Sequence, residues 1–164
     1  MEMNLGSALK KADISPNIIP ENNDFPVQIQ AKFNSSGEDV ALGNFIEPSK
    51  SADIPELTLI GLDSTAEYTL LLVDPDAPCK EDPKWGPYRS GKIDEGKALS
   101  AYMGPAPPPK TGDHRYIFLL YKQPKTQAAF GVLAKERANW EFKTFVKDND
   151  LELVGINFFV SRKD

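Results

Sequence analysis

Apolar positions along the chain group into five segments that have the spacing or the length of β-strands. In residues 25–33, FPVQIQAKF, every second side chain is apolar, which is the period of a half-buried strand. Residues 66–73 and 115–121 contain unbroken apolar runs, which predict strands covered on both faces. Residues 56–62 and 151–161 are rich in β-favouring side chains. The pattern therefore predicts a mainly β protein.

Helical spacing occurs at two places, before the first of these strands and before the last. Leu5, Ala8, Leu9 and Ala12 are spaced like one face of a short helix, and apolar residues recur at helical intervals within 130–149. We find no internal repeat and no linker. We therefore expect residues 1–164 to form a single domain, in which residues 1–24 are a peripheral N-terminal segment and one helix precedes the final strand.

Composition and charge limit the cellular compartments and the classes of binding partner that we expect for this protein. Fourteen prolines and eleven glycines, concentrated between the apolar segments, suit the many turns of an antiparallel β domain. The net charge of −5 argues against general nucleic-acid binding, which needs clustered Lys and Arg. A single cysteine, Cys79, excludes an intramolecular disulfide, and the first 20 residues lack an apolar run for secretion, so we expect a cytoplasmic protein. Membrane contact is expected to be peripheral at most.

The first chemically unusual segment is DPDAP, residues 74–78, which directly follows a predicted buried strand. Two prolines restrict the backbone around two carboxylates, so the segment is a rigid acidic corner. Aspartates in such turns commonly accept hydrogen bonds from nearby backbone amides. The alternative is that one of them faces a cavity as an acceptor.

The second segment is GPAPPPKTGDHRY, residues 104–116, which precedes another predicted buried strand and carries His114, the only histidine. Consecutive prolines make it stiff, and Gly112 permits a close backbone approach. A single histidine beside an apolar strand is more often packed than functional. A binding role for His114 is the alternative, and it is favoured by the fact that both segments place ionisable residues at the end of a buried strand.

The chain lacks the residue motifs that several common enzyme classes require. There is no G-x-S-x-G motif and no P-loop ending in G-K-[ST], and one His with one Cys cannot form a usual zinc site. Cys79 is best interpreted as an unreactive thiol. We therefore expect a protein that is not an enzyme and that uses neither a metal nor a cofactor.

Several motifs together identify a family. DPDAP followed by DPKW, and then YMGPAPPPKTGDHRYIFLLYKQP, closely resemble the phosphatidylethanolamine-binding protein family, whose signature pairs a DPDAP loop with a G-x-HRY strand. LGNFIEP and PELTL occur upstream, and RANW and LVGINFF downstream, in the expected order. The resemblance covers most of residues 26–160 and is strongest to the fungal branch, which includes an inhibitor of a serine carboxypeptidase.

The resemblance implies an antiparallel β-sandwich with a few peripheral helices and a small anion pocket at one end. The residues implied to line the pocket are Asp74, Pro78, Trp85, Ala106, His114 and Tyr116. His114 and Tyr116 would donate hydrogen bonds to phosphate oxygens, and Asp74 would orient the imidazole or receive an ammonium group. Asp76 and Arg115 would form a supporting ion pair under the pocket.

The chain departs from the family pattern at two places. The family has a second histidine shortly after the aromatic residue that matches Trp85, and this chain has none there; a glycine-rich stretch after Trp140 is also missing. Both junctions resemble excisions from a longer chain. Arg89 is a possible source of positive charge in place of the histidine, although a surface arginine is the simpler interpretation.

Two functions of different class follow from the resemblance. The first is a non-catalytic module that binds phosphate or a phospholipid head group, and we expect it to be monomeric. The alternative is a protein inhibitor of a serine carboxypeptidase, or a modulator of a signalling kinase. For an inhibitor, the segment Met1 to Asp24 would be the part that inserts into or covers the target.

Overall fold

Nine strands, two α-helices and one 3-10 helix make up the described part of the chain. The computed structural model describes residues 5–20, 24–77, 88–94, 97–100, 102–124 and 142–164, and of 88–94 and 97–100 it describes the backbone alone. In chain order the elements are α1 (Leu5–Lys11), β1 (Gln28–Phe33), β2 (Glu38–Asp39), β3 (Asn44–Phe45), η1 (Pro48–Lys50), β4 (Glu56–Ile60), β5 (Tyr68–Asp74), β6 (Tyr88–Asp94), β7 (Lys97–Ser100), β8 (His114–Lys122), α2 (Phe142–Asp148) and β9 (Glu152–Ser161).

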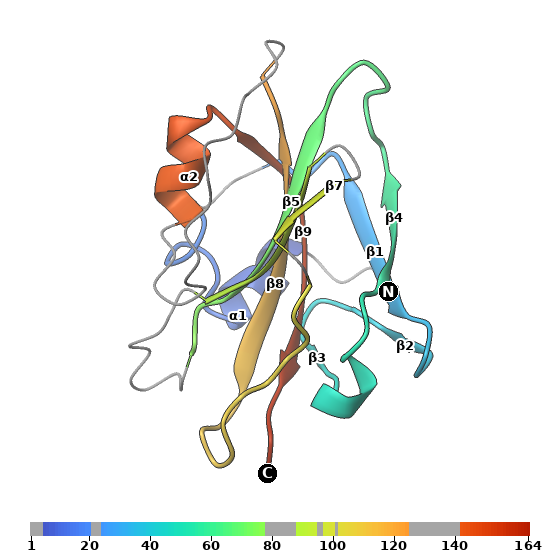
Figure 1. Cartoon of the computed structure of the whole chain (residues 1–164). Helices are drawn as coiled ribbons and strands as arrows, with labels where there is room; N and C mark the ends of the chain where they lie inside the picture. The colour runs from blue at the N-terminus through green and yellow to red at the C-terminus, as the bar shows by residue number, and fades with distance from the viewer. Residues whose placement is uncertain (1–4, 21–23, 78–87, 95–96, 101, 125–141) are drawn as a thin grey trace.

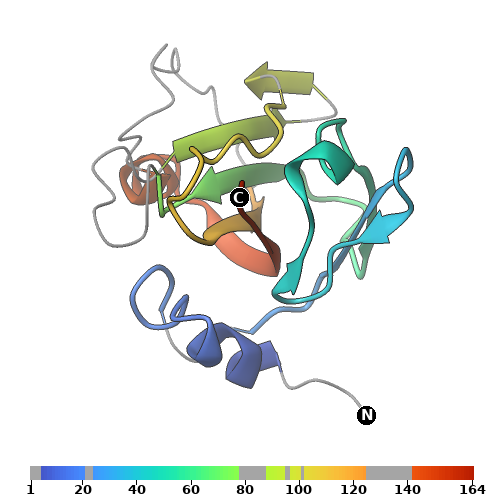
Figure 2. The same cartoon turned by 90° about the horizontal axis from the view of Figure 1, so that it is seen from below.

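The strands form two sheets that pack face to face. The smaller sheet has the order β2-β1-β4 and the larger one has the order β3-β9-β8-β5-β6-β7. Among the described residues, all strand pairs are antiparallel except β3 with β9, which is parallel. Figure 2, which looks along the strands, shows the small sheet on one side of the large sheet and the helices on its other side. The predicted antiparallel sandwich with peripheral helices is confirmed, with this one parallel pair as an addition.

The first hydrophobic core lies between the two sheets. β1 contributes Ile29, Ala31 and Phe33 to it, and its alternating exposed and buried side chains agree with the predicted period of two. From the large sheet, Phe159 meets Phe33 edge to face, with ring centroids 5.6 Å apart. Apolar burial between the sheets therefore fixes the face that each strand turns inward.

The second core covers the opposite face of the large sheet. Leu9 of α1, together with Ile14 and Ile19 after it, is buried there against β5 and β8. Phe142 of α2 is buried in the same cluster. The N-terminal segment lies at the periphery of the ribbon (Figure 2), yet its apolar side chains are part of the core. Because β5 and β8 are covered on both faces, their sequences are continuously apolar.

Some elements differ from the sequence-based expectation. β6 and β7 extend the large sheet beyond β5, although residues 88–100 have no apolar strand pattern and were not predicted to be strands. Their strand conformation comes from backbone pairing of β6 with β5 and of β7 with β6, which the side-chain pattern does not encode. Of the helix predicted within 130–149, α2 occupies residues 142–148, and residues 125–141 lie outside the described ranges. Within those ranges, no helix has the length and apolar character needed to cross a membrane.

Candidate functional site

The two chemically unusual segments meet at one end of the large sheet. β5 ends at Asp74 and its antiparallel neighbour β8 begins at His114, so the two residues lie at the same end of the large sheet. In Figure 1 this is the lower end, where β9 also runs out to the C-terminus. Residues 40 positions apart in sequence are thereby brought into contact.

His114 is completely buried, and both of its ring nitrogens face oxygen atoms of the protein. Its Nδ1 lies 2.9 Å from Asp74 Oδ2, and its Nε2 lies 3.0 Å from Thr111 Oγ1. The hydroxyl of Thr111 donates to the carbonyl oxygen of Pro108 at 2.7 Å. The Thr111 hydroxyl therefore lies between the Pro108 carbonyl oxygen and the His114 ring.

Two oxygen atoms fix the orientation of the His114 ring. Asp74 Oδ2 faces Nδ1 and Thr111 Oγ1 faces Nε2, and which nitrogen donates depends on the tautomer of the ring. The Asp74 carboxylate is the buried partner of the imidazole at 2.9 Å. The ring is thereby held in one position at the start of β8.

Asp74 also shapes the loop that it begins. Its Oδ1 accepts a hydrogen bond from the backbone N–H of Asp76 at 2.8 Å, which is the turn-forming role that aspartates in such segments commonly have. Its other oxygen contacts His114, so one carboxylate both closes the turn and orients the imidazole. The turn-forming interpretation of DPDAP therefore applies to Asp74.

Tyr116 lies next to His114 on the same face of β8. Its ring stacks on that of His114 with centroids 6.4 Å apart, and on Phe159 with centroids 5.3 Å apart. Burial raises the pKa of the Tyr116 hydroxyl well above its usual value, and the negative charge of Asp74 raises it further. The hydroxyl therefore stays protonated and remains a hydrogen-bond donor at neutral pH.

Asp76 and Arg115 form a nearly buried ion pair beside these groups. Arg115 Nε and Nη2 donate to the two carboxylate oxygens of Asp76 at 2.8 and 2.7 Å, and the backbone N–H of Arg115 donates to the same carboxylate. Burial alone would lower the pKa of the guanidinium, but the hydrogen bonds and charge of Asp76 raise it above its usual value. Arg115 thus stays charged and holds the DPDAP loop against β8.

Arg115 also connects this end of the sheet to the N-terminal segment. Its Nη1 donates to the carbonyl oxygens of Ala12 and Asp13 at 3.0 and 3.1 Å. These carbonyls follow the last turn of α1. One guanidinium therefore links the chain after α1, β8 and the DPDAP loop.

The remaining predicted site residues are placed less closely, or not at all. Ala106 is exposed on the proline-rich loop, and Pro78 and Trp85 lie outside the described residues, as does Cys79. Arg89 lies on β6 opposite Val73, with only its backbone described. Thr111 was not predicted, since one threonine in a loop carries no recognisable pattern.

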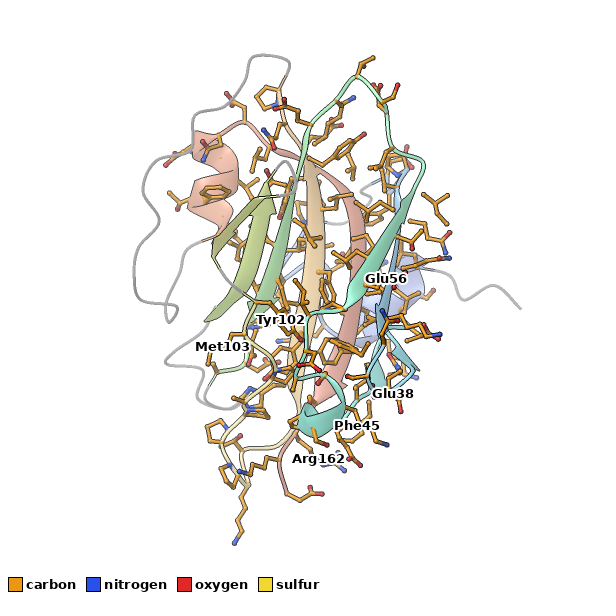
Figure 3. The ribbon with its side chains drawn as sticks, turned by 45° about the vertical axis from the view of Figure 1, so that its right-hand side comes forward. Glu38, Phe45, Glu56, Tyr102, Met103 and Arg162 are labelled. Carbon is orange, nitrogen blue, oxygen red and sulfur yellow. The ribbon has the colours of Figure 1, made fainter. Side chains whose placement is uncertain are left out.

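The loop that carries Thr111 is tied to the rest of the sandwich. Tyr102, before the loop, donates its hydroxyl to the carbonyl oxygen of Ser51 at 2.6 Å, and burial raises the pKa of that hydroxyl. At the far end of the loop, Asp113 pairs with Arg162 at 2.9 Å. The Arg162 guanidinium lies 4.8 Å from the centre of the Phe45 ring, and Figure 3 shows these two residues at the same lower end as Met103.

A two-sheet sandwich with these two loops at one end defines the class of protein. The chain matches the family described as phosphatidylethanolamine-binding protein over residues 87–159. Within the described residues we find no group of three or more potential metal ligands.

The particular relatives confirm this class over nearly the whole chain. The carboxypeptidase Y inhibitor of Saccharomyces cerevisiae is 31% identical, and the match covers 92% of this chain and 91% of the relative. The crystal structure of carboxypeptidase Y inhibitor in complex with its cognate proteinase superposes with a TM-score of 0.86 at 29% identity, covering 98% of this chain and 95% of that one. The chain therefore belongs to the phosphatidylethanolamine-binding protein family.

A more distant member shares the fold. The phosphatidylethanolamine-binding protein from Plasmodium vivax superposes with a TM-score of 0.82 at 22% identity, covering 96% of this chain and 97% of that one. The alignment with the yeast relative spans 200 residues, whereas this chain has 164, so that relative contains segments without a counterpart here. This agrees with the expectation that the chain lacks stretches found in the family.

Proposed function

We propose that this protein is a non-catalytic module that binds a small phosphate-bearing anion at the end of β5 and β8. The observation that carries the proposal is the buried His114 ring, held by Asp74 at Nδ1 and facing the Thr111 hydroxyl at Nε2; the proposal takes both ring nitrogens to be protonated. A phosphate oxygen that replaced Thr111 Oγ1 would accept a charge-assisted hydrogen bond from Nε2–H. Family membership supports the same class of ligand, either as free phosphate or as a phospholipid head group.

The neighbouring groups suit this role. Tyr116 supplies a hydroxyl that stays protonated, and Asp74 keeps the imidazole in its donating form. A phosphate ester with an ammonium group, such as phosphoethanolamine, would gain a partner in the carboxylates of this end of the sheet. Pro78, Trp85 and Ala106 remain predicted lining residues.

Calorimetric titration with inorganic phosphate and with phosphoethanolamine tests the proposal. We expect His114→Ala to abolish measurable binding and Tyr116→Phe to weaken it about tenfold, since one hydrogen bond to a charged group is lost. Tyr121→Phe is the matched control, because Tyr121 is a buried tyrosine of the same strand whose ring lies in the opposite core. Equal affinity of the wild type, Tyr116→Phe and Tyr121→Phe would contradict a role for Tyr116, and unchanged binding by His114→Ala would refute the site.

A second function, inhibition of a serine carboxypeptidase, is favoured by the yeast relative. That protein is a carboxypeptidase Y inhibitor, and it aligns with this chain almost from end to end. We propose that the N-terminal end of this chain contacts such a protease. Modulation of a signalling kinase remains a weaker alternative, supported only by the resemblance noted in the sequence.

Because the N-terminal segment packs into the second core, only a short deletion can test the inhibitor proposal without exposing that core. Removing all of residues 1–24 would uncover the second core, because Leu9, Ile14 and Ile19 are buried in it. Deleting only residues 1–4, which precede α1, leaves those side chains in place. We expect this short deletion to reduce inhibition of a serine carboxypeptidase strongly, whereas Tyr116→Phe, at the anion site, should inhibit like the wild type. Full inhibition by the deletion variant would contradict the proposal.

A further inference from the structure

Ser161, the last residue of β9, carries a buried hydroxyl that has no hydrogen-bond partner among the described residues. The residue is fully buried, with 0% of its surface exposed. A buried polar atom without a partner is uncommon in native proteins and calls for an explanation, such as a water molecule or a ligand. The position of Ser161 in the sheet points to the explanation.

The sheet register places Ser161 beside His114. The two residues are directly opposite each other on the antiparallel strands β8 and β9. Side chains opposite each other in such a pair lie on the same face, with Cβ atoms about 4.5–5.5 Å apart. Ser161 is therefore a lateral neighbour of the histidine.

The alternation of side chains confirms which face this is. Tyr116 and Phe159 are the next opposed pair along the same two strands, and both belong to the core between the two sheets. His114 lies two residues before Tyr116 and Ser161 lies two residues after Phe159, so both share that face. On β5, Asp74 follows Leu72 of the same core by two residues.

At this end of the large sheet, three neighbouring strands each place a polar residue on the face that is turned toward the small sheet. Asp74, His114 and Ser161 come from β5, β8 and β9 in the order in which these strands are paired. The first two are bonded to each other, and the third has a hydroxyl with no partner. Below them, Tyr116 and Phe159 stack and close the layer.

We infer that Ser161 is a further ligand-contacting residue of the anion site, whose hydroxyl donates to an oxygen of the bound phosphate group. This inference rests on the proposed function of the site. The hydroxyl and the Nε2–H of His114 then hold two oxygens of one phosphate, which is the shared chemistry of free phosphate and of a phosphomonoester or phosphodiester head group. A tetrahedral anion suits donors that converge from neighbouring strands.

Two measurements on Ser161→Ala in the full chain test the inference. Without ligand, we expect an unchanged or higher melting temperature, because the variant removes a buried hydroxyl that has no partner. With inorganic phosphate in a calorimetric titration, we expect an affinity at least about tenfold lower than that of the wild type, because one hydrogen bond to an anion is lost. Should the alanine variant not fold, Ser161→Cys, which keeps a side chain of similar shape with a weak donor, replaces it.

Ser51→Ala is the matched control, since Ser51 is also a fully buried serine but its hydroxyl donates to the carbonyl oxygen of Glu47 at 3.0 Å. We expect this control to lower the melting temperature and to leave phosphate affinity unchanged. The two serines should therefore show opposite results in both measurements.

The outcomes separate the inference from the proposed function. If the wild type binds phosphate and Ser161→Ala binds equally well, the inference is overturned and the buried hydroxyl belongs to a bound water. If the wild type does not bind phosphate or glycerophosphoethanolamine, the anion site itself is refuted and the inference with it. Comparing these two probes on the wild type distinguishes a free anion from a lipid head group. A loss in Ser161→Ala confined to glycerophosphoethanolamine would also contradict contact with the phosphate.

Discussion

Thr111 is the residue that a phosphate would displace in the proposed site. Its hydroxyl lies 3.0 Å from His114 Nε2 and donates to the carbonyl oxygen of Pro108. In the proposal, a phosphate oxygen replaces this hydroxyl as the partner of Nε2–H. The free-energy change of this exchange should be small, because the hydrogen bond to the hydroxyl is replaced by a hydrogen bond to the phosphate.

Thr111→Val should separate stability from binding. We expect the free energy of unfolding to fall by about 1 to 3 kcal/mol, because the buried Nε2–H loses its partner. Phosphate affinity should rise, because the anion no longer competes with the hydroxyl. Chemical denaturation and calorimetry measure the two effects. Thr58→Val, at an exposed position of β4, is the control, and lower phosphate affinity in Thr111→Val would contradict the exchange.

At the scale of elements, Arg115 joins segments that the sequence separates widely. It contacts Asp76 after β5 and the carbonyl oxygens of Ala12 and Asp13 after α1. The Asp76 side chain is 2% exposed and that of Arg115 is 13% exposed, so the pair has little access to water. Removing one partner of such a pair leaves an uncompensated buried charge.

Arg115→Ala should therefore destabilise the fold by about 3 to 5 kcal/mol and loosen the N-terminal segment. Hydrogen exchange should become faster at the amides of Ile14 and Ile18, which are bonded to backbone carbonyls of that segment. Arg162→Ala is the control, because Arg162 is half exposed and its ion pairs with Asp113 and Asp164 lie at the surface. Equal free energies of unfolding for the two variants would show that the contacts of Arg115 do not stabilise the fold.

At the scale of the whole molecule, Asn157 of β9 joins the two sheets through polar groups. Its Nδ2 donates to the carbonyl oxygens of Ile29 and Val40, and its Oδ1 accepts from the backbone N–H groups of Leu42 and Phe158. Two positions earlier, a Cβ on Gly155 would lie 2.9 Å from the carbonyl oxygen of Val27. The small sheet thus approaches β9 closely enough to need a glycine and a four-bonded amide.

Asn157→Ala should be among the most destabilising single substitutions in this chain. It leaves four backbone groups without their partner, and we expect a loss of about 3 kcal/mol or more in the free energy of unfolding. Urea denaturation measures this loss. Asn34→Ala, which removes an exposed hydrogen bond to Glu56, should change stability by less than about 0.5 kcal/mol. A similar small effect for Asn157→Ala would contradict its role between the sheets.

The sequence predicted those strands whose residues follow an apolar pattern and missed those that are defined by backbone pairing. β1, β5, β8 and β9 were predicted because apolar burial imposes a period of two or a continuous apolar run on the residues themselves. β6 and β7 were not, because β6 is defined by backbone pairing with β5 and β7 by backbone pairing with β6, and the side-chain pattern does not indicate this pairing. The burial of Ile14 and Ile19 was not predicted either, since the apolar residues between α1 and β1 follow no regular period.

The sequence by itself determined the alternating faces of β1, the continuously apolar character of β5 and β8 and the two motifs that identify the family, because these properties lie in residues close together along the chain. Only the tertiary structure decided which groups meet. It brings Asp74 to 2.9 Å from His114 and sets Ser161 beside the same ring. The physical reason is that strand pairing joins residues 40 or more positions apart, and the free energy that selects this pairing comes from burying both faces of the large sheet.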